Sequence, residues 1–345
     1  MDIIIVGFGT VGQGVAEALS RKAPSIQSAF KEKMRVVGVF DSKSYDLSPK
    51  GLDPREVAAR KAKLGKVGPD LEGRRLIEVL QDVKYDVMVE VTPTNIKDAE
   101  PGFGNMMAAL SAGKDVVTAN KGPLALRFRQ LSKAAEKSGA RLRFEASVGG
   151  ATPVINMSRE LLMGERILSI RGIENGTCNF ILNRMRDEGL PFDQALREAQ
   201  EMGYAERDPT YDIDGIDSAA KAAILANAIF RRDVTFDDVR RTGIRGVSLE
   251  AVELAAEEKK VIRLIAEVSE SRLEVSPRLV PTGHPLAIGG TLNIFQLMTD
   301  LAGDITVAGR GAGKMETASA ILSDLVALMK EDCASRRRNG SGNRI

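Results

Sequence analysis

The first 145 residues alternate short apolar runs with stretches that repeat at the helical period. The apolar runs predict buried strands at residues 3–6, 34–40, 87–91, 115–118 and 141–145. Helical patterns lie between them, most clearly over residues 103–112 and 124–138. Strands that alternate with helices predict a parallel sheet covered on both faces. Residues 43–75, rich in Lys, Gly, Pro and Asp, predict an inserted and partly irregular connection.

The pattern changes after residue 145 to longer helical stretches with a few short strands. Helices are predicted over residues 153–163, 191–202, 216–230 and 248–269, and strands near residues 167–173 and 272–280. We therefore expect a second, α+β domain over residues 146–313. A helix over about residues 314–330 could pack back on the first domain. Residues 331–345, which contain Arg336, Arg337 and Arg338, have the composition of a disordered tail.

A glycine fingerprint lies between the first predicted strand and the first predicted helix. The segment Gly7-Phe8-Gly9-Thr10-Val11-Gly12 matches the pattern G-x-G-x-x-G. Its glycines allow a tight turn, so pyrophosphate oxygens can approach backbone amides at the positive end of the helix. Residues 1–145 are thus predicted to form a Rossmann-type dinucleotide-binding domain, with these six residues at the cofactor. A purely structural glycine turn is the alternative.

Two further residues follow predicted strands of this domain. Asp41 could accept hydrogen bonds from the adenosine ribose, which favours NAD because a carboxylate repels the 2′-phosphate of NADP. Lys43 could offset that repulsion, and Asp41 could simply be a turn residue, so both cofactors stay open. Thr92, in Thr92-Pro93-Thr94, lies where such sheets bind ligands, although Thr-Pro is also ordinary turn chemistry.

The composition narrows the chemistry that the chain can perform. Its 345 residues are 43% hydrophobic and 28% charged, which fits a soluble protein of one large or two modest domains. Two cysteines, Cys178 and Cys333, and the single His284 argue against a disulfide framework and histidine-rich or cysteine-rich metal sites. Acid–base work is left to Lys, Asp, Glu and Tyr. We expect a cytoplasmic protein without nucleic-acid or membrane partners, since the net charge is only +2 and no long apolar segment or secretory signal occurs.

The segment from Glu206 to Lys221 carries five acids and a lysine before an apolar helical stretch. The spacing of a calcium-binding loop and its terminal glutamate are absent. Lys221 lies four residues after Asp217, so both side chains share one helix face, where the carboxylate can orient the ammonium. On spacing alone, a solvated ion pair is the favoured explanation of these two residues.

The whole stretch Gly203-Tyr204-Ala205-Glu206-Arg207-Asp208-Pro209-Thr210-Tyr211-Asp212-Ile213-Asp214-Gly215-Ile216-Asp217-Ser218-Ala219-Ala220-Lys221 resembles the signature of homoserine dehydrogenase. Three further segments resemble that family in the same order: Val117-Thr118-Ala119-Asn120-Lys121, Glu145-Ala146-Ser147-Val148-Gly149-Gly150 with Thr152-Pro153, and Gly172-Ile173-Glu174-Asn175-Gly176-Thr177. The resemblance covers essentially residues 1–330. It implies NAD(P)-dependent interconversion of L-homoserine and L-aspartate 4-semialdehyde in threonine and methionine biosynthesis. It also implies a homodimer formed through the second domain, in a short form without kinase or ligand-sensing domain.

The same resemblance assigns roles in the reaction to individual residues. Lys221 is the implied proton donor, with Asp217 and Lys121 as further catalytic residues. Glu206 and Asp217 are implied to hold the amino-acid substrate, with Asp212 near its reacting end. Lys121 would lie between substrate and cofactor, and Gly313, beside Gly311, would approach the nicotinamide. Cys178 is expected to be a buried, inert thiol and His284 to be structural.

The resemblance further implies a monovalent-cation site, such as one for sodium. Glu145, Val148, Gly150 and Thr152 would form it, largely through backbone carbonyls, and a glycine-rich loop between domains is the alternative reading. Two rival functions also stay open at this point. One is a related two-domain oxidoreductase that acts on another amino-acid-derived carbonyl, and the other is a non-catalytic dinucleotide sensor.

Overall fold

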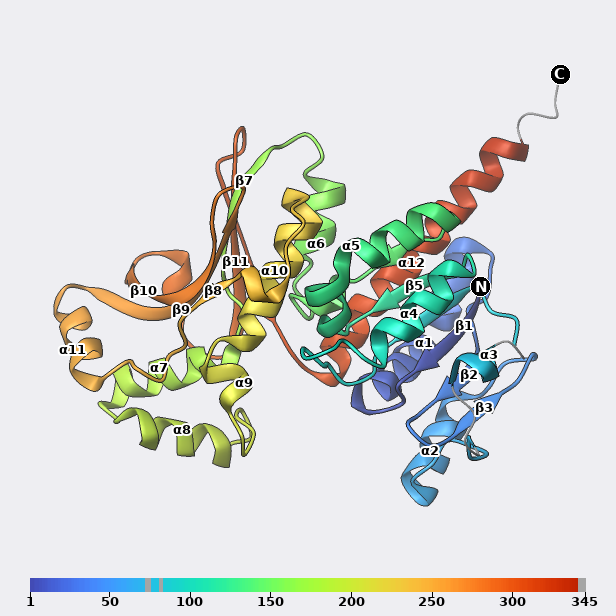
Figure 1. The fold of residues 1–345 in the computed structure, drawn as a ribbon, viewed down its shortest axis with the longest axis horizontal. Helices are drawn as coiled ribbons and strands as arrows, with labels where there is room; N and C mark the ends of the chain where they lie inside the picture. The colour runs from blue at the N-terminus through green and yellow to red at the C-terminus, as the bar shows by residue number, and fades with distance from the viewer. Residues whose placement is uncertain (72–75, 81–82, 341–345) are drawn as a thin grey trace. The chain divides into compact units, whose positions relative to one another are not determined.

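The computed structural model describes residues 1–71, 76–80 and 83–340, and the chain folds as two compact units (Figure 1). The first unit comprises Met1–Ser147 and the segment that begins at Gly313, and the second comprises Val148–Ala312. Within the described ranges, no helix combines the length and the apolar character that a membrane crossing requires.

The first unit is built on a six-stranded sheet with the order β3-β2-β1-β4-β5-β6. All neighbouring strands run parallel except β3, which pairs antiparallel with β2. The central strand β1 carries Ile3, Ile4 and Ile5, all fully buried, as a sheet covered on both faces requires. The strands are β1 (Asp2–Val6), β2 (Arg35–Phe40), β3 (Tyr45–Leu47), β4 (Val87–Glu90), β5 (Asp115–Thr118) and β6 (Leu142–Arg143). The predicted parallel α/β arrangement is confirmed.

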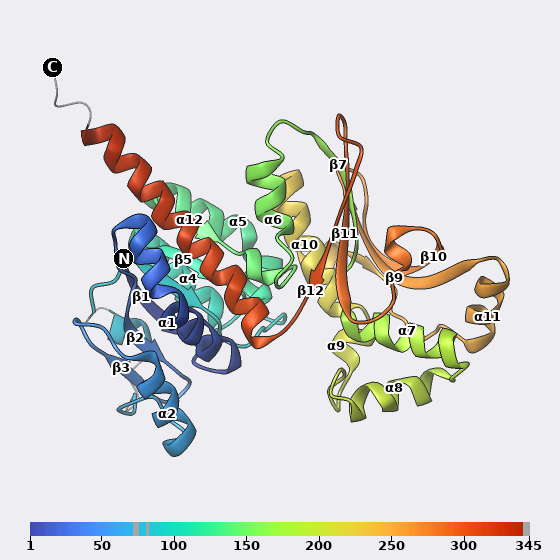
Figure 2. The ribbon, with the colours of Figure 1, turned by 180° about the vertical axis from the view of Figure 1, so that it is seen from behind.

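Helices cover both faces of this sheet. Helices α1 and α12 lie on one face, and α4 and α5 lie on the other (Figures 1 and 2). Ala318, Ile321 and Leu325 of α12 join the same buried core as Val15 and Leu19 of α1. The helices are α1 (Thr10–Phe30), α2 (Pro54–Leu64), α3 (Leu76–Leu80), α4 (Gly102–Ser111), α5 (Lys121–Ser138) and α12 (Lys314–Gly340), with a 3-10 turn at Glu145–Ser147.

The C-terminal helix is longer than the sequence pattern predicts. Disorder was expected from residue 331, yet α12 continues to Gly340, so that expectation does not hold for residues 331–340. Arg141 anchors the start of the extension, because its guanidinium lies 3.1 Å from Glu331 Oε2 and 2.8 Å from Asp332 Oδ1. Arg336 also pairs with Glu32. Such partners, distant in sequence, are invisible to a composition argument, and residues 341–345 lie outside the described part of the chain.

The second unit is an α+β fold, as predicted, around a sheet with the order β12-β11-β7-β9-β10-β8. The first five strands pair antiparallel with their neighbours, and β8 is parallel to β10. Helix α10 packs on β9 and β10. The strands are β7 (Ile167–Ile173), β8 (Arg240–Arg241), β9 (Lys260–Ser269), β10 (Leu273–Pro281), β11 (Leu292–Thr299) and β12 (Asp304–Arg310). The helices are α6 (Val154–Asn156) with a π-helical turn at Met157–Leu161, α7 (Gly176–Glu188), α8 (Phe192–Glu201), α9 (Thr210–Ile213), α10 (Ile216–Phe230) and α11 (Leu249–Glu257), with 3-10 turns at Phe236–Asp238 and Pro285–Ala287.

One predicted element of this unit is wrong. A single helix was expected over residues 248–269, but α11 ends at Glu257 and residues 260–269 form the strand β9. Lys259, with φ 55°, turns the chain between the two elements. The apolar residues of β9 at positions 261, 264, 265 and 268 are spaced as on a helix face, so the local pattern favours a helix. Pairing with β7 on one side and β10 on the other makes this segment a central strand instead.

Candidate active site

The acid-rich segment places Asp217 and Lys221 on the first two turns of α10, which begins after Gly215. Lys221 Nζ lies 2.7 Å from Asp217 Oδ2, and the two side chains are only 8% and 10% exposed. The pair is therefore a buried ion pair, and the solvated alternative is excluded. Because two charges lose hydration on burial, such a pair adds little net stability. Stability therefore does not explain the pair, which points to a functional role.

A second contact fixes the Lys221 ammonium from the sheet. Lys221 Nζ donates a hydrogen bond to the backbone oxygen of Glu174, directly after β7. An ammonium has three hydrogens, so the described contacts account for two of them. The third can donate to a ligand oxygen without disturbing the ion pair with Asp217.

Asn175 connects an acid on each of two helices to the start of a third helix. Its Nδ2 donates to Asp212 Oδ1 at 2.6 Å and to Asp217 Oδ2 at 3.2 Å, and its Oδ1 accepts from the amide of Cys178 at 2.9 Å. That last contact caps α7, so Asn175 ties α7 to α9 and α10. Burial raises the pKa of Asp212, and the nearby Asp217 charge adds to the shift. Asp212, Asp217 and Lys221 are thus held together in one buried cluster.

Glu174 belongs to this cluster, although the sequence pattern assigned it no role. Its side chain is 1% exposed, and neither carboxyl oxygen has a hydrogen-bond partner among the described residues. Burial raises its pKa to about 8, which the Lys221 charge opposes and the Asp217 charge reinforces. The carboxyl is therefore mostly uncharged at pH 7. Its position directly after β7 is the one signal in the sequence, and that signal does not show that the side chain is buried beside Lys221.

The other acids of the segment lie outside this cluster. Glu206 is exposed on the loop between α8 and α9. Asp208 accepts a hydrogen bond from the amide of Thr210 at 3.1 Å, and Asp214 pairs with Arg245 at 3.0 Å. Asp208 and Asp214 therefore have structural partners, and the substrate role of Glu206 stays a prediction.

Cys178 and His284 have structural surroundings. Burial raises the pKa of the Cys178 thiol, whose Sγ donates to the backbone oxygen of Asp212 at 3.2 Å. A thiol in such surroundings is not an activated nucleophile. His284 Nδ1 accepts from the amide of Leu286 at 3.1 Å and so caps the 3-10 turn that follows.

The glycine fingerprint forms the turn from β1 into α1, as the dinucleotide motif requires. Gly7 has φ 101°, and its amide donates to the backbone oxygen of Phe40 at 2.9 Å. A Cβ atom on Gly12 would lie 2.3 Å from Gly7 O, whereas one on Gly9 would meet nothing within 4 Å. The backbone at Gly9 is therefore open at the positive end of α1, whose first turn carries no acid. These residues fit a bound pyrophosphate.

Asp41 is held by more contacts than its position at the end of β2 predicts. Its Oδ1 accepts from the amides of Lys43 and Ser44 at 2.8 and 2.7 Å, and its Oδ2 pairs with Lys61 Nζ at 2.5 Å. Burial opposes ionisation here, but these hydrogen bonds hold the pKa of Asp41 below its usual value. Lys61, not the exposed Lys43, supplies the neighbouring ammonium. It comes from α2, inside the segment expected to be partly irregular, and was missed.

Thr92 and Lys121 both follow strands at the carboxyl edge of the first sheet. Thr92 follows β4 by two residues, and Lys121 follows β5 by three residues and opens α5. Asn120 Nδ2 donates to Thr92 Oγ1 at 3.1 Å, so one hydrogen bond joins the two loops. Ligands of parallel sheets bind at this edge.

The residues of the predicted cation site are divided between the units. Glu145 is buried in the first unit, and Val148, Gly150 and Thr152 belong to the second. Thr152 Oγ1 is buried without a hydrogen-bond partner in the described part of the chain, which suits a cation ligand. Residues 1–71, 76–80 and 83–340 contain no group of three or more His, Cys, Asp or Glu side chains that could hold a metal. A site made of backbone carbonyls stays a prediction.

Gly313 precedes α12 and has φ 138°, a conformation that disfavours any side chain. Its backbone oxygen accepts from the amide of Thr317 at 3.0 Å, which starts the helix. A Cβ atom at Gly313 would also lie 2.1 Å from Glu316 Oε2. The structure thus explains this glycine by the start of α12, and its contact with nicotinamide stays a prediction.

Known proteins resemble the chain over nearly its whole length. Residues 7–145 match the family model of the homoserine dehydrogenase NAD-binding domain, and residues 153–326 match that of homoserine dehydrogenase. The homoserine dehydrogenase of Methanocaldococcus jannaschii is 47% identical over 94% of this chain and 98% of that protein. A structure from Archaeoglobus fulgidus, provisionally assigned as a homoserine dehydrogenase, has a TM-score of 0.88 and 49% identity, covering 95% of this chain and 99% of its own. A mutant of a hyperthermophilic archaeal homoserine dehydrogenase in complex with NADPH has a TM-score of 0.82 and 31% identity, covering 94% and 96%. The chain therefore belongs to the homoserine dehydrogenase family of NAD(P)-dependent oxidoreductases.

Proposed function

We propose that the Lys221 cluster carries the proton transfer when this enzyme interconverts L-homoserine and L-aspartate 4-semialdehyde. The nicotinamide, when bound, donates or accepts the hydride. In the direction of reduction, negative charge develops on the carbonyl oxygen, and the Lys221 ammonium is placed to donate a proton to it. In the direction of oxidation, neutral Lys221 takes the hydroxyl proton. The observation that carries this proposal is the buried ion pair of Lys221 with Asp217.

Two acids of the cluster suit the substrate's ammonium group. Asp212 and Asp217 both accept from Asn175, so their carboxylates face one place in the fold. A cation that enters there gains charge-assisted hydrogen bonds from groups already desolvated. Glu206, on the exposed loop before α9, is proposed as a further ligand of homoserine. Glu174, mostly uncharged at pH 7, would leave the net charge of the cluster close to balanced.

Lys121, Thr92 and Gly313 are proposed to contact the nicotinamide end of the cofactor. The first two lie at the carboxyl edge of the first sheet, and Lys121 adds a positive charge that can polarise the reacting oxygen. Gly7, Phe8, Gly9, Thr10, Val11 and Gly12 would hold the pyrophosphate. A monovalent cation such as sodium, held through Glu145, Val148, Gly150 and Thr152, completes the proposed ligand set.

The assay for this function is direct. Purified protein, L-homoserine and either NAD or NADP should produce reduced nicotinamide, followed by its absorbance. The second candidate, a related oxidoreductase, would reduce or oxidise another amino-acid-derived substrate and leave homoserine untouched. A wild-type protein that binds the cofactor yet oxidises none of these substrates would be a dinucleotide sensor.

Lys61 is expected to determine how well NADP is accepted. Its ammonium lies 2.5 Å from Asp41 Oδ2, beside the predicted ribose site. Without it, the Asp41 charge is uncompensated and repels a 2′-phosphate more strongly. We expect Lys61→Met to raise the KM for NADP about tenfold, near the energy of one charge-assisted hydrogen bond, while the KM for NAD changes less than about threefold.

The matched control for Lys61 is Lys66→Met, in the loop that follows α2. Lys66 pairs with Asp70 in an exposed ion pair and should leave both KM values unchanged. Equal losses for NAD and NADP in Lys61→Met would contradict the role in cofactor preference.

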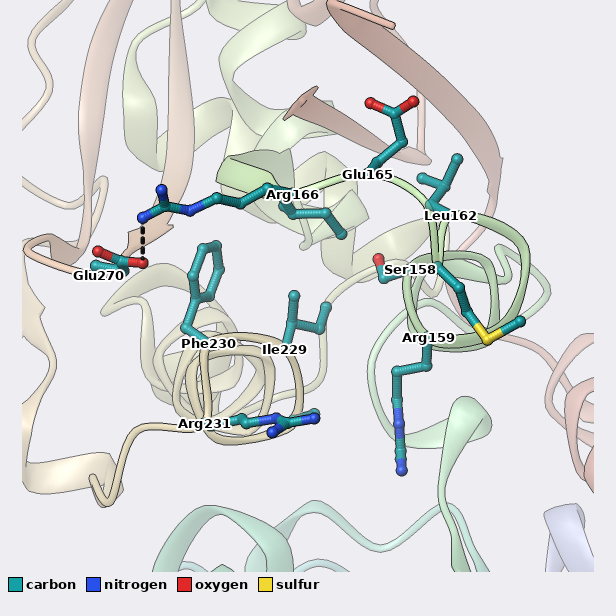
Figure 3. A pocket seen from close by; sticks show the side chains of 12 residues that line it. Ser158, Arg159, Leu162, Glu165, Arg166, Ile229, Phe230, Arg231 and Glu270 are labelled. Carbon is teal, nitrogen blue, oxygen red and sulfur yellow. Dashed lines mark hydrogen bonds and ion pairs between the residues drawn. The ribbon is translucent and has the colours of Figure 1, made fainter. Parts of the chain in front are cut away.

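We further propose that the enzyme is a cytoplasmic homodimer that associates through its second unit. Large apolar side chains are exposed around the start of β7, where Leu161 and Met163 are each 79% exposed and Leu301 is 76% exposed. A hollow of about 600 Å³ lies beside them, with Ile229, Phe230 and three arginines on its walls (Figure 3). Exposed apolar patches of this kind are typical of protein interfaces. Two free cysteines, Cys178 and Cys333, are compatible with a reducing compartment.

Leu161→Asp combined with Met163→Asp is expected to convert the dimer into a monomer, since two charges would be buried at the interface. Light scattering after size exclusion measures the mass directly. Leu254→Asp on α11, where the side chain is 62% exposed, is the control and should leave the mass of a dimer. A double variant that still elutes as a dimer would place the interface elsewhere.

A further inference from the structure

Glu90, the last residue of β4, is a buried acid that the proposed reaction does not use. Its side chain is fully buried. Oε1 accepts from the amide of Thr92 at 3.2 Å and from Thr92 Oγ1, and Oε2 lies 3.4 Å from Thr118 Oγ1. All of these donors are neutral. Burying a carboxylate with neutral donors alone costs free energy, so the residue calls for an explanation beyond packing.

The hydrogen bonds around Glu90 continue into the next loop. Asn120 Nδ2 donates to Thr92 Oγ1 at 3.1 Å, and the Thr92 hydroxyl donates onward to Glu90. On its other side, Asn120 Oδ1 accepts from the amide of Gly122 at 3.1 Å and caps α5. One chain of donors and acceptors therefore runs from the start of α5 to Glu90. Lys121 lies between Asn120 and Gly122, the two residues that this capping hydrogen bond joins.

The space around this chain is closed. Gly102, at the start of α4, would place a Cβ atom 2.5 Å from Asn120 Nδ2 and 3.3 Å from Glu90 Oε2. The amide of Asn120 also donates to Thr118 Oγ1 at 2.9 Å. The starts of α4 and α5 and the loop after β4 thus all pack around the Glu90 carboxylate. Burial raises the pKa of Glu90 to about 7, and the hydrogen bonds from Thr92, Asn120 and Thr118 oppose that rise.

We propose that Glu90 is a positioning residue that fixes Thr92 directly and Lys121 through Asn120, so that both meet the bound nicotinamide in one geometry. The inference rests on the roles proposed above for Thr92 and Lys121. Glu90 itself touches neither substrate nor cofactor. It acts in its ionised form, which predominates above its pKa of about 7. In that form both oxygens accept, whereas an amide of the same shape must donate on one side.

Glu90→Gln is the primary test. The substituted Nε2 would face Asn120 Nδ2, donor against donor, so the loop and α5 should separate slightly. We expect the Kd of reduced cofactor to rise about tenfold and kcat to fall about tenfold, as for one broken buried hydrogen bond. The KM for homoserine should stay within about twofold, because Asp212 and Asp217 are untouched. A variant with wild-type Kd and kcat would overturn the proposal.

A compensating exchange separates positioning from folding. When Glu90→Gln is combined with Asn120→Asp, the introduced amide can donate to the introduced carboxylate, which can still cap α5. Cofactor affinity and kcat should recover most of the loss, and a double variant no better than the single one would contradict the network. Should Glu90→Gln fail to fold, Asn120→Ser keeps a capping oxygen, breaks the link to Thr92 and should weaken cofactor binding likewise. An Asn120→Ser variant with wild-type affinity would overturn the proposal.

Asp86→Asn is the matched control, four residues earlier and just before the amino end of β4. Its side chain is 61% exposed, and it should change neither Kd nor kcat. Cofactor titration followed by nicotinamide fluorescence needs no homoserine. A wild-type protein that does not oxidise homoserine would therefore refute the proposed function, while the effect of Glu90→Gln on cofactor affinity would still be measurable.

Discussion

Lys221→Ala is expected to lower kcat for homoserine oxidation by about 10²- to 10⁴-fold, the range typical of a lost general acid or base. The expectation follows from a buried ammonium that Asp217 and the Glu174 carbonyl both hold in place. Because the loss arises in the chemical step, the KM for the cofactor should change little. Initial rates measured as reduced nicotinamide absorbance, with NAD and with NADP, test this.

A loss of activity in Lys221→Ala must be separated from a loss of folding. The variant leaves Asp217 buried without its cation, which can cost about 3–5 kcal/mol of stability. Lys221→Ala with Asp217→Asn removes both charges and should recover the thermal midpoint but not the rate. Lys260→Ala, in an exposed pair with Glu258, is the control and should keep the wild-type rate. Full activity in Lys221→Ala would refute the proposed proton donor.

The five parallel strands of the first sheet could be predicted because each coincides with a short apolar run, whereas the antiparallel edge strand β3 lies in the segment expected to be irregular and was missed. The segment at residues 248–269 could not, since its apolar spacing suits a helix and its pairing partners, β7 and β10, come from elsewhere in the chain. The local hydrophobic pattern therefore predicts the elements that the local sequence determines, and it misassigns those that depend on pairing with distant strands. The extension of α12 by Arg141 follows the same rule.

The candidate site shows a similar division. Lys221 and Asp217 could be predicted because their segment resembles the family signature, whereas their four-residue spacing on one helix face fits a solvated ion pair as well. Glu174 and Lys61 were missed, since nothing in their local sequence shows that one is buried beside Lys221 and that the other reaches Asp41. Motifs name the residues on a functional element, whereas their partners from other elements emerge only from the fold.

Substitution of two glycines of the fingerprint by alanine is expected to have different effects, on stability at Gly12 and on cofactor affinity at Gly9. At Gly12 the new Cβ would lie 2.3 Å from Gly7 O, and Gly7 cannot retreat, because it lies directly against the backbone of Val91. Overpacking against fixed backbone typically costs about 1–3 kcal/mol or more, so we expect Gly12→Ala to lower the free energy of unfolding by about 3 kcal/mol. Urea unfolding of the apoprotein measures it.

At Gly9 a Cβ meets nothing within 4 Å, and the residue's φ of −83° suits alanine. Gly9→Ala should therefore keep the wild-type free energy of unfolding to within about 0.5 kcal/mol. Its methyl group would instead occupy the space where pyrophosphate approaches the positive end of α1, so the cofactor Kd should rise at least about tenfold. A Gly9→Ala variant with wild-type cofactor affinity would show that the pyrophosphate does not bind at this turn. A Gly12→Ala variant with wild-type stability would show that the backbone of the turn can shift to accommodate the methyl group. The pair distinguishes a glycine that the fold requires from one that the cofactor requires, which a shared motif alone cannot do.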